Sequence, residues 1–232
     1  MQINSNYLEK LCKKLLEYDP NIVEVIQFGS SIYAPQYAKD IDLLVITKKI
    51  KNYEGYFDAT NPEDALFNVD VLVFEINKAP RQDLLRSILG AFKVLYGNGK
   101  YLLEYIKTLT DPTFDEARSS LRIAFSLMKL AFETKNQLDK DRSIREAFDS
   151  LFHAARIASM VYLSIEVSRR GLIKKELPEP YKNKFNEFIN ILHIKYFYND
   201  EYPKEKIKEE FDLWFNKVKE YINELESLMK KK

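Results

Sequence analysis

Cysteine and long apolar runs are scarce in this chain. One cysteine, Cys12, stands among 232 residues, which excludes an intrachain disulfide and any cysteine-rich zinc site. No stretch approaches the length of an apolar membrane span, and the first residues lack the apolar run of a signal peptide. We therefore expect a soluble, cytoplasmic protein that has no membrane partner.

An excess of charge of one sign is also missing. The chain has 36 Lys and Arg against 35 Asp and Glu, which gives a net charge of +1. Proteins that bind duplex nucleic acid usually carry a strong basic bias, because they must neutralise phosphates. We therefore expect no duplex nucleic acid among the partners.

Apolar and aromatic residues are plentiful. They include 15 Tyr and 15 Phe, and the length suits two domains. Residues 1–100 predict an α+β unit with a mixed sheet, because an amphipathic helix near the N-terminus precedes strand-like runs at 23–28, 41–47 and 69–76, and helical spacing returns at 84–96. Residues 101–113 are expected to be a linker. Residues 114–232 predict an all-α helical bundle with helices near 114–138, 143–169, 181–196 and 204–229.

Two carboxylates stand at the start of the second predicted strand. Asp40 and Asp42 are two residues apart, so their side chains point to the same face of the sheet. Like charges at that distance require a cation or a raised pKa, and hard carboxylate oxygens suit Mg²⁺ or Mn²⁺. Asp70, inside the third apolar run, is either a third metal ligand or a cap at the solvated end of its strand.

A Gly-Ser turn follows the first predicted strand. Gly29 allows a sharp turn, and the backbone N–H groups and the Ser30 hydroxyl can then bind an anion. A phosphate at the turn and a metal ion at the aspartates together predict a nucleotide triphosphate site. We take Gly29, Ser30, Ser31 and Lys39 as the candidate nucleotide-binding residues.

These residues carry a family resemblance. Gly29-Ser30, the run from Asp40 to Val45 and Asp70 resemble the nucleotidyltransferase core of the DNA polymerase β superfamily, in particular the minimal nucleotidyltransferases and kanamycin nucleotidyltransferase. The resemblance covers roughly residues 20–100. The second half resembles, more loosely, the helical domain of kanamycin nucleotidyltransferase and the HEPN domains that accompany minimal nucleotidyltransferases.

The resemblance implies an activity. A nucleoside monophosphate would pass from an NTP, with ATP as the first candidate, to a hydroxyl of a small molecule or a protein, and pyrophosphate would leave. Asp40 and Asp42 would bind both Mg²⁺ or Mn²⁺ ions, and Asp70 would hold the catalytic metal ion and help to deprotonate the acceptor. Family analogy also allows a homodimer.

The turn departs from the family pattern. Many members have a GSRARG-like turn, whereas this chain has Ser31 to Ala34 there, and Lys39 is the candidate to replace the missing arginine. An alternative function is therefore a weak or inactive nucleotidyltransferase fold that serves as a regulatory or antitoxin-like binding protein. A third hypothesis, nucleotide addition to RNA, uses the same chemistry but is opposed by the near-neutral charge.

The helical half offers a row of polar residues at spacings of three or four: Arg142, Glu146, Asp149, His153 and Arg156. By analogy with the kanamycin enzyme, Glu146 is our candidate for the base that activates the acceptor, with Asp149 and His153 as alternatives. The competing interpretation is a solvated helix face with intrahelical ion pairs. The spacing from Arg145 to His153 exceeds that of HEPN ribonucleases, so we disfavour that activity.

Overall fold

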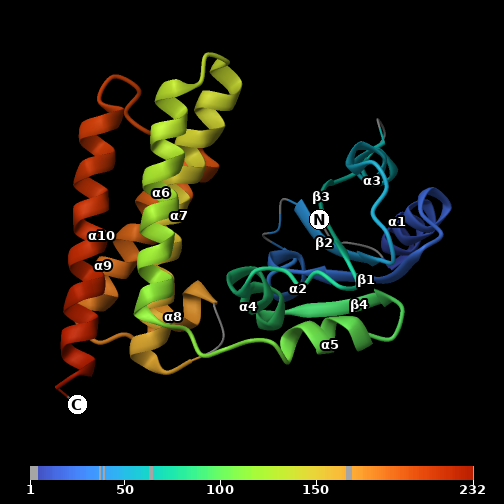
Figure 1. The fold of residues 1–232 in the computed structure, drawn as a ribbon, viewed down its shortest axis with the longest axis horizontal. Coiled ribbons are helices and arrows are strands. Elements are labelled where there is room, and N and C mark those ends of the chain that lie inside the picture. Colours follow the sequence, from blue (N-terminus) through green and yellow to red (C-terminus); the bar gives the residue numbers. More distant parts are fainter. Residues whose placement is uncertain (1–4, 37, 39, 63–64, 166–168, 232) are drawn as a thin grey trace. The chain divides into compact units, whose positions relative to one another are not determined.

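The computed structural model describes residues 5–36, 38, 40–62, 65–165 and 169–231. The chain forms two compact units, Met1–Thr110 and Asp111–Lys232 (Figure 1). The boundary falls between Thr110 and Asp111. Thr110 is held to the first unit, because its carbonyl accepts a hydrogen bond from the buried Arg86 at 2.7 Å.

A four-stranded mixed sheet forms the centre of the first unit. Its strands are β1 (Ile22–Phe28), β2 (Asp40–Thr47), β3 (Asn68–Glu75) and β4 (Phe92–Tyr96), in the spatial order β3-β2-β1-β4. β1 is antiparallel to both of its neighbours, and β2 and β3 are parallel. The predicted α+β class, with a mixed sheet followed by a helical bundle, is confirmed.

Helices cover both faces of the sheet. On one face, α1 (Ser5–Tyr18) and α3 (Tyr53–Thr60) pack through Leu11, Leu15 and Tyr56 onto the odd-numbered residues of β2. On the other face, α4 (Gln82–Gly90) and α5 (Lys100–Ile106) pack onto Leu44 and Ile46. Residues 40 and 42 alternate with the buried positions of the first face, so they lie on the α4/α5 face.

The prediction of one helix over 84–96 was wrong. Helix α4 ends at Gly90, and residues 92–96 form strand β4, which pairs with β1 through Phe28–Phe92 and Ile26–Val94. The run Phe-Lys-Val-Leu-Tyr favours a strand, because aromatic and β-branched residues pack well on a pleated surface. A run this short fits both the repeat of about 3.6 residues in a helix and the repeat of two residues in a strand. Pairing with β1 decides in favour of the strand.

The predicted linker over 101–113 is also corrected. Its first part is helix α5, whose Leu102 and Tyr105 are buried in the first unit. The buried Glu24 of β1 accepts hydrogen bonds from the backbone N–H groups of Tyr101 and Leu102 at 3.0 and 3.1 Å. A carboxylate at a helix N-terminus is favourable, so Glu24 fixes α5 against the sheet.

The second unit is a helical bundle. It consists of α6 (Phe114–Glu133), α7 (Gln137–Leu163), α8 (Arg170–Glu176), α9 (Tyr181–Phe188), the π-helix η1 (Ile189–Tyr198) and α10 (Ile207–Met229). The second predicted helix began six residues too late and continued past the observed end of α7. In the described part of the chain, no helix has both the length and the apolar character to cross a membrane.

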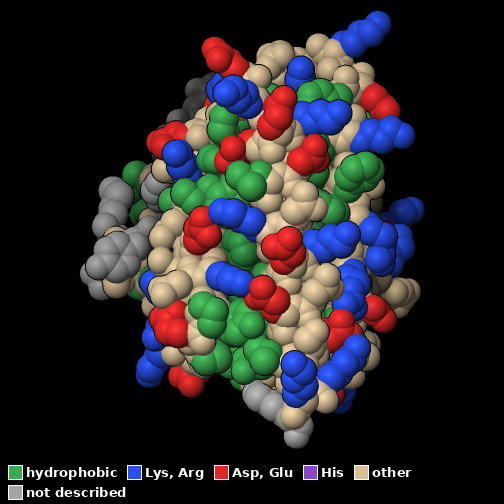
Figure 2. Space-filling model, turned by 90° about the vertical axis from the view of Figure 1, so that its left-hand side faces the viewer, with side chains coloured by type: hydrophobic (Ala, Val, Ile, Leu, Met, Phe, Trp, Pro, Cys, Tyr) green, Lys and Arg blue, Asp and Glu red, His purple; other side chains and the backbone are tan. Residues whose placement is uncertain are grey.

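Charges of both signs share the surface. On the face drawn in Figure 2, basic and acidic side chains are interspersed, with exposed hydrophobic side chains between them. This distribution agrees with the balanced composition of the chain, and no single-sign field is expected over such a surface.

Asp19 is a buried carboxylate that joins three elements of the first unit. It accepts hydrogen bonds from Tyr56 Oη at 2.6 Å, Thr47 Oγ1 at 2.7 Å and the Asn21 N–H at 3.0 Å. Burial acts to raise the pKa of Asp19, but these hydrogen bonds outweigh it and hold the pKa below its ordinary value. The ionised form is therefore the one that stabilises the fold.

We expect Tyr56→Phe to lower the free energy of unfolding by about 1.5–3 kcal/mol, the usual worth of a hydrogen bond to a charged group. Because the pKa of Asp19 is lowered in the fold, its contribution is present above about pH 4 and is lost as the pH falls further. The difference between wild type and variant in urea unfolding should therefore shrink in acid. Tyr96→Phe, at an exposed residue of β4, is the control and should change little. Equal stability of Tyr56→Phe and wild type at pH 7 would contradict this role for Asp19.

Candidate functional site

The in-register pairing of β2 with β3 brings the carboxylates together. In the parallel ladder, Asp42 lies directly opposite Asp70, and Asp40 lies opposite Asn68. Directly opposed residues of paired strands point to the same face, and Asp40 and Asp42 share a face by alternation. All three carboxylates therefore project from the α4/α5 face, at the edge where β2 and β3 begin.

The Gly29 turn lies against this group. Gly29 follows β1 with φ of 77°, a left-handed conformation that favours glycine. A Cβ atom at residue 29 would lie 2.4 Å from Oδ2 of Asp42, so any other residue would collide with the carboxylate. The turn predicted to bind phosphate and the aspartates predicted to bind metal ions are therefore adjacent.

The side chains of the turn are placed differently from one another. Ser30 begins the short helix α2 (Ser30–Tyr33). Ser31 is buried, and its hydroxyl accepts a hydrogen bond from Gln27 Nε2 at 2.9 Å and donates one to the Phe28 carbonyl at 3.3 Å. In this structure Ser31 thus holds the turn onto β1. Lys39, also predicted to bind nucleotide, lies outside the described residues.

The three carboxylates repel one another. Burial, together with the charges of Asp40 and Asp70, raises the pKa of Asp42 to about 7. Partial burial and the charge of Asp40 raise the pKa of Asp70. Among the described residues, no hydrogen bond or ion pair to the Asp42 carboxylate offsets these effects. Asp42 is therefore poised to accept a positive charge.

The donor set suits a hard divalent cation, because carboxylate oxygens at one point are the ligands that Mg²⁺ and Mn²⁺ prefer. The described residues contain no group of three His, Cys, Asp or Glu side chains close enough to hold a metal ion as they stand. Mutual repulsion drives carboxylates apart in the absence of a counter-charge. At Asp42 this repulsion adds to the effect of burial in raising the pKa.

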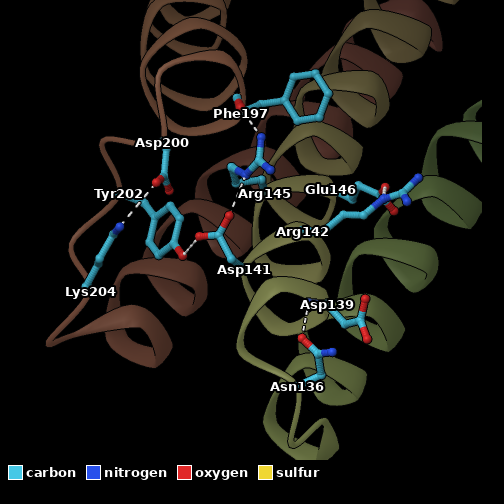
Figure 3. A network of polar contacts seen from close by, with 10 residues as sticks. All are labelled: Asn136, Asp139, Asp141, Arg142, Arg145, Glu146, Phe197, Asp200, Tyr202 and Lys204. Carbon is cyan, nitrogen blue, oxygen red and sulfur yellow. Dashed lines mark hydrogen bonds and ion pairs between the residues drawn. The ribbon is translucent and has the colours of Figure 1, made fainter. Parts of the chain in front are cut away.

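In the second unit the predicted polar row divides into two groups. Glu146 forms an ion pair with Arg142 at 2.8 Å on an exposed part of α7. As Figure 3 shows, this pair lies on a different face of the helix from Asp141, which contacts Tyr202 and Arg145. The Arg142–Glu146 contact is the ion pair expected from a solvated helix face. The role of Glu146 as an acceptor base stays a prediction.

Asp149 is buried between the two histidines of the chain. Its Oδ2 lies 2.8 Å from His153 Nε2, and its Oδ1 lies 2.6 Å from His193 Nδ1 on the π-helix η1. Arg156 Nη2 lies 2.6 Å from His153 Nδ1, and because arginine can only donate, the N–H of His153 is at Nε2. Burial acts to raise the pKa of Asp149, but the two histidines hold it well below the ordinary range.

Sequence reasoning missed this cluster in part. It singled out Asp149 and His153 through their spacing along the helix, but His193 was not among the predicted site residues. Nothing in the spacing along the chain connects residues 149 and 193, because packing of η1 against α7 makes the contact. The chain has only two histidines, and this scarcity is the one feature of the sequence that could have drawn attention to His193.

Comparison with known proteins gave only remote likenesses. No protein-family profile and no curated protein sequence matches the chain. A toxin–antitoxin structure with AMP-PNP has 17% identity and a TM-score of 0.37, and the match covers 53% of this chain and 97% of the other. The complex of a tri-AMPylated Shewanella oneidensis HEPN toxin with its MNT antitoxin has 15% identity, a TM-score of 0.35 and coverages of 54% and 97%.

A longer match is to a nucleotidyltransferase-like protein from Exiguobacterium sibiricum. It covers 94% of this chain and 75% of the other, with 13% identity and a TM-score of 0.31.

We expect the carboxylate site to make stability fall as the pH rises in metal-free buffer. Because the pKa of Asp42 is raised from about 4 to about 7, the folded state binds more protons than the unfolded state between these values. Asp42→Asn should therefore gain stability relative to wild type from pH 5 to pH 8, as measured by urea unfolding in EDTA. Asp58→Asn, at an exposed residue of α3, should show no such gain. A pH-independent difference between Asp42→Asn and wild type would contradict the mutual repulsion.

We expect Asp149→Asn to destabilise the second unit by about 1.5–3 kcal/mol, the usual worth of a hydrogen bond to a charged group, because the buried Asp149 carboxylate contacts both His153 and His193. Glu146→Gln is the matched control on the same helix, and loss of an exposed ion pair should cost less than about 1 kcal/mol. Thermal unfolding followed by circular dichroism measures both. A similar small cost for the two variants would show that the histidine contacts contribute little.

Proposed function

We propose that this chain transfers a nucleoside monophosphate from an NTP, with ATP as the nucleotide to test first, to a hydroxyl of a small molecule or a protein. The observation that carries the proposal is the position of Asp42, opposite Asp70 in the ladder and in contact range of the Gly29 turn. A triphosphate and divalent cations need the two kinds of group that meet there, carboxylate oxygens and the backbone of a turn.

The reaction balances without a further reactant. The acceptor oxygen forms a bond to the α-phosphorus, the bond from that phosphorus to the bridging oxygen breaks, and pyrophosphate leaves. Asp40, Asp42 and Asp70 would hold Mg²⁺ or Mn²⁺, which supplies positive charge to the triphosphate and lowers the pKa of the acceptor hydroxyl. Asp70, at an exposed position on β3, would help to accept the proton of the hydroxyl.

The turn supports a role in positioning the phosphates. Gly29 brings the backbone next to Asp42, and the contacts of Ser31 with Gln27 and Phe28 fix the path of the chain through α2. A site that is held by such contacts loses little entropy when a ligand binds. Ser30 would contact the phosphates directly, and Lys39 would add the charge that the family pattern supplies with arginine.

An alternative function is a binding protein that keeps the fold with little or no turnover. Two observations favour it: the hydroxyl of Ser31 is engaged in the core, and the carboxylates are not gathered as a metal site. Such a protein would bind a nucleotide or a protein partner and transfer nothing.

We expect label from α-³²P-ATP, but not from γ-³²P-ATP, to enter an acceptor when the protein is incubated with Mg²⁺ and a cell lysate. The double variant Asp40→Ala, Asp42→Ala should reduce the transfer by at least about 100-fold, because even the loss of a residue that only orients a metal ligand costs about 10–100-fold. Asp58→Ala on the opposite face of the sheet is the matched control and should retain the activity. Addition of EDTA should abolish the transfer by the wild type and by the Asp58→Ala control.

Two outcomes would decide against this proposal. Transfer that persists in the double variant would exclude the carboxylate site. An absence of transfer, combined with a stability gain from Mg²⁺-ATP near the 2.7 kcal/mol expected at 100 times the dissociation constant, would favour the binding protein instead.

A further inference from the structure

Helix α6 carries two stripes of residues on opposite sides. The inner stripe is buried in the bundle and consists of Ala117, Leu121, Ala124, Met128 and Ala131. The outer stripe consists of Ser119, Ile123, Ser126 and Leu130. Each of these residues follows a residue of the inner stripe by two positions. Because two residues advance a helix by about 200°, the outer stripe faces away from the core. Both stripes have the alternating spacing of four and three that packed helices use.

Two of the four residues of the outer stripe, Ile123 and Leu130, are apolar where a surface helix is usually polar. Ile123 and Leu130 are 40% and 50% exposed, and the neighbouring Phe125 and Phe132 are 58% and 52% exposed. A shallow groove of about 310 Å³ runs along this side of the helix. Its lining comes from α6 alone: Ser119, Arg122, Ile123, Ser126, Leu127 and Leu130. Apolar side chains that line one groove, as Ile123, Leu127 and Leu130 do, mark a candidate interaction site.

Charges at the margin of the groove show which partner fits. Arg122 lines the groove and has no ion pair with any described residue, whereas Arg118, Arg142 and Arg145 of the bundle are paired with carboxylates. Glu133, at the other end of the helix, makes only a long contact of 3.8 Å with Lys129, and both side chains are exposed. The helix thus offers an unpaired positive charge near one end of the groove and an available negative charge near the other.

We propose that the outer stripe of α6 docks against α6 of a second copy of this chain, antiparallel across a two-fold axis at Ser126. In this arrangement the small Ser126 side chains face each other, and Ile123 of one copy lies near Leu130 of the other. Position 133 of one helix then faces position 119 of the other, one turn from Arg122. Two Arg122–Glu133 pairs form, one on each side of the axis. A parallel arrangement would instead place Arg122 against Arg122 and is disfavoured by like-charge repulsion.

The size of the contact sets the expected affinity. A helix of 20 residues is about 30 Å long and about 10 Å wide, so one helix pair buries less than a standard interface of about 800 Å² per partner. Interfaces of that size belong to weak or transient complexes. We therefore expect a dissociation constant in the micromolar range rather than an obligate dimer.

Sedimentation velocity of the full chain between about 1 and 100 µM tests the association. Wild type should shift from monomer to dimer over this range. Ser126→Glu places two like charges at the axis and should raise the dissociation constant at least about 100-fold. Leu138→Glu is the control: Leu138 is also an exposed apolar residue, 81% exposed, but it lies at the start of α7 and off the stripe, so its substitution should change nothing.

Charge reversal and cross-linking test the register. Arg122→Glu should weaken the dimer, and the double variant Arg122→Glu, Glu133→Arg should restore it. Ser126→Cys should form an intermolecular disulfide on mild oxidation, because residues at the axis of a close helix pair come within the Cα–Cα range of a disulfide, whereas Leu138→Cys should not. The native Cys12 is buried and should not interfere.

Three results would overturn the proposal. They are a monomer at every concentration, a dimer that Ser126→Glu leaves intact, and a dimer that the double charge reversal fails to restore. Circular dichroism of each variant separates a lost contact from a lost fold.

Discussion

The in-register pairing of β2 with β3 is the contact on which the candidate site depends. It places Asp70 opposite Asp42, while alternation along β2 places Asp40 beside them on the same face. A slip of one residue would turn Asp70 to the α1/α3 face, where the core is apolar. The register is itself fixed by burial, because Val69 and Val73 must face that core. The hydrophobic pattern that folds the sheet therefore also brings the carboxylates together.

The buried and half-buried acidic groups of this protein are compensated in different ways. Asp19 accepts three hydrogen bonds, Glu24 accepts two from the N-terminus of α5, and Asp149 is held by two histidines. Burial, together with the like charges of Asp40 and Asp70, raises the pKa of Asp42, whereas these contacts outweigh burial and lower the pKa values of Asp19 and Asp149. A pKa shifted in this way marks Asp42 as a candidate functional residue, and the cation that we propose for this site would offset the repulsion.

The errors of the sequence predictions share a physical cause. Residues 92–96 were assigned to a helix and 101–106 to a linker, because short apolar runs do not reveal their partners. β4 exists through its ladder with β1, and α5 is fixed by Glu24, a residue some 77 positions earlier. Long periodic segments were predicted better, as α6, α7 and α10 show, since a helix of 20 residues or more repeats its pattern several times.

The sequence by itself determined the first three strands, the division into a mixed α+β unit and a helical bundle, and the shared face of Asp40 and Asp42. These follow from local periodicity and from the alternation of strand side chains. Only the tertiary structure decided that Asp70 stands opposite Asp42, that Gly29 packs against it, and that His193 joins His153 at Asp149. Such contacts join residues far apart in the chain, and strand pairing and helix packing, which bury apolar surface, select them.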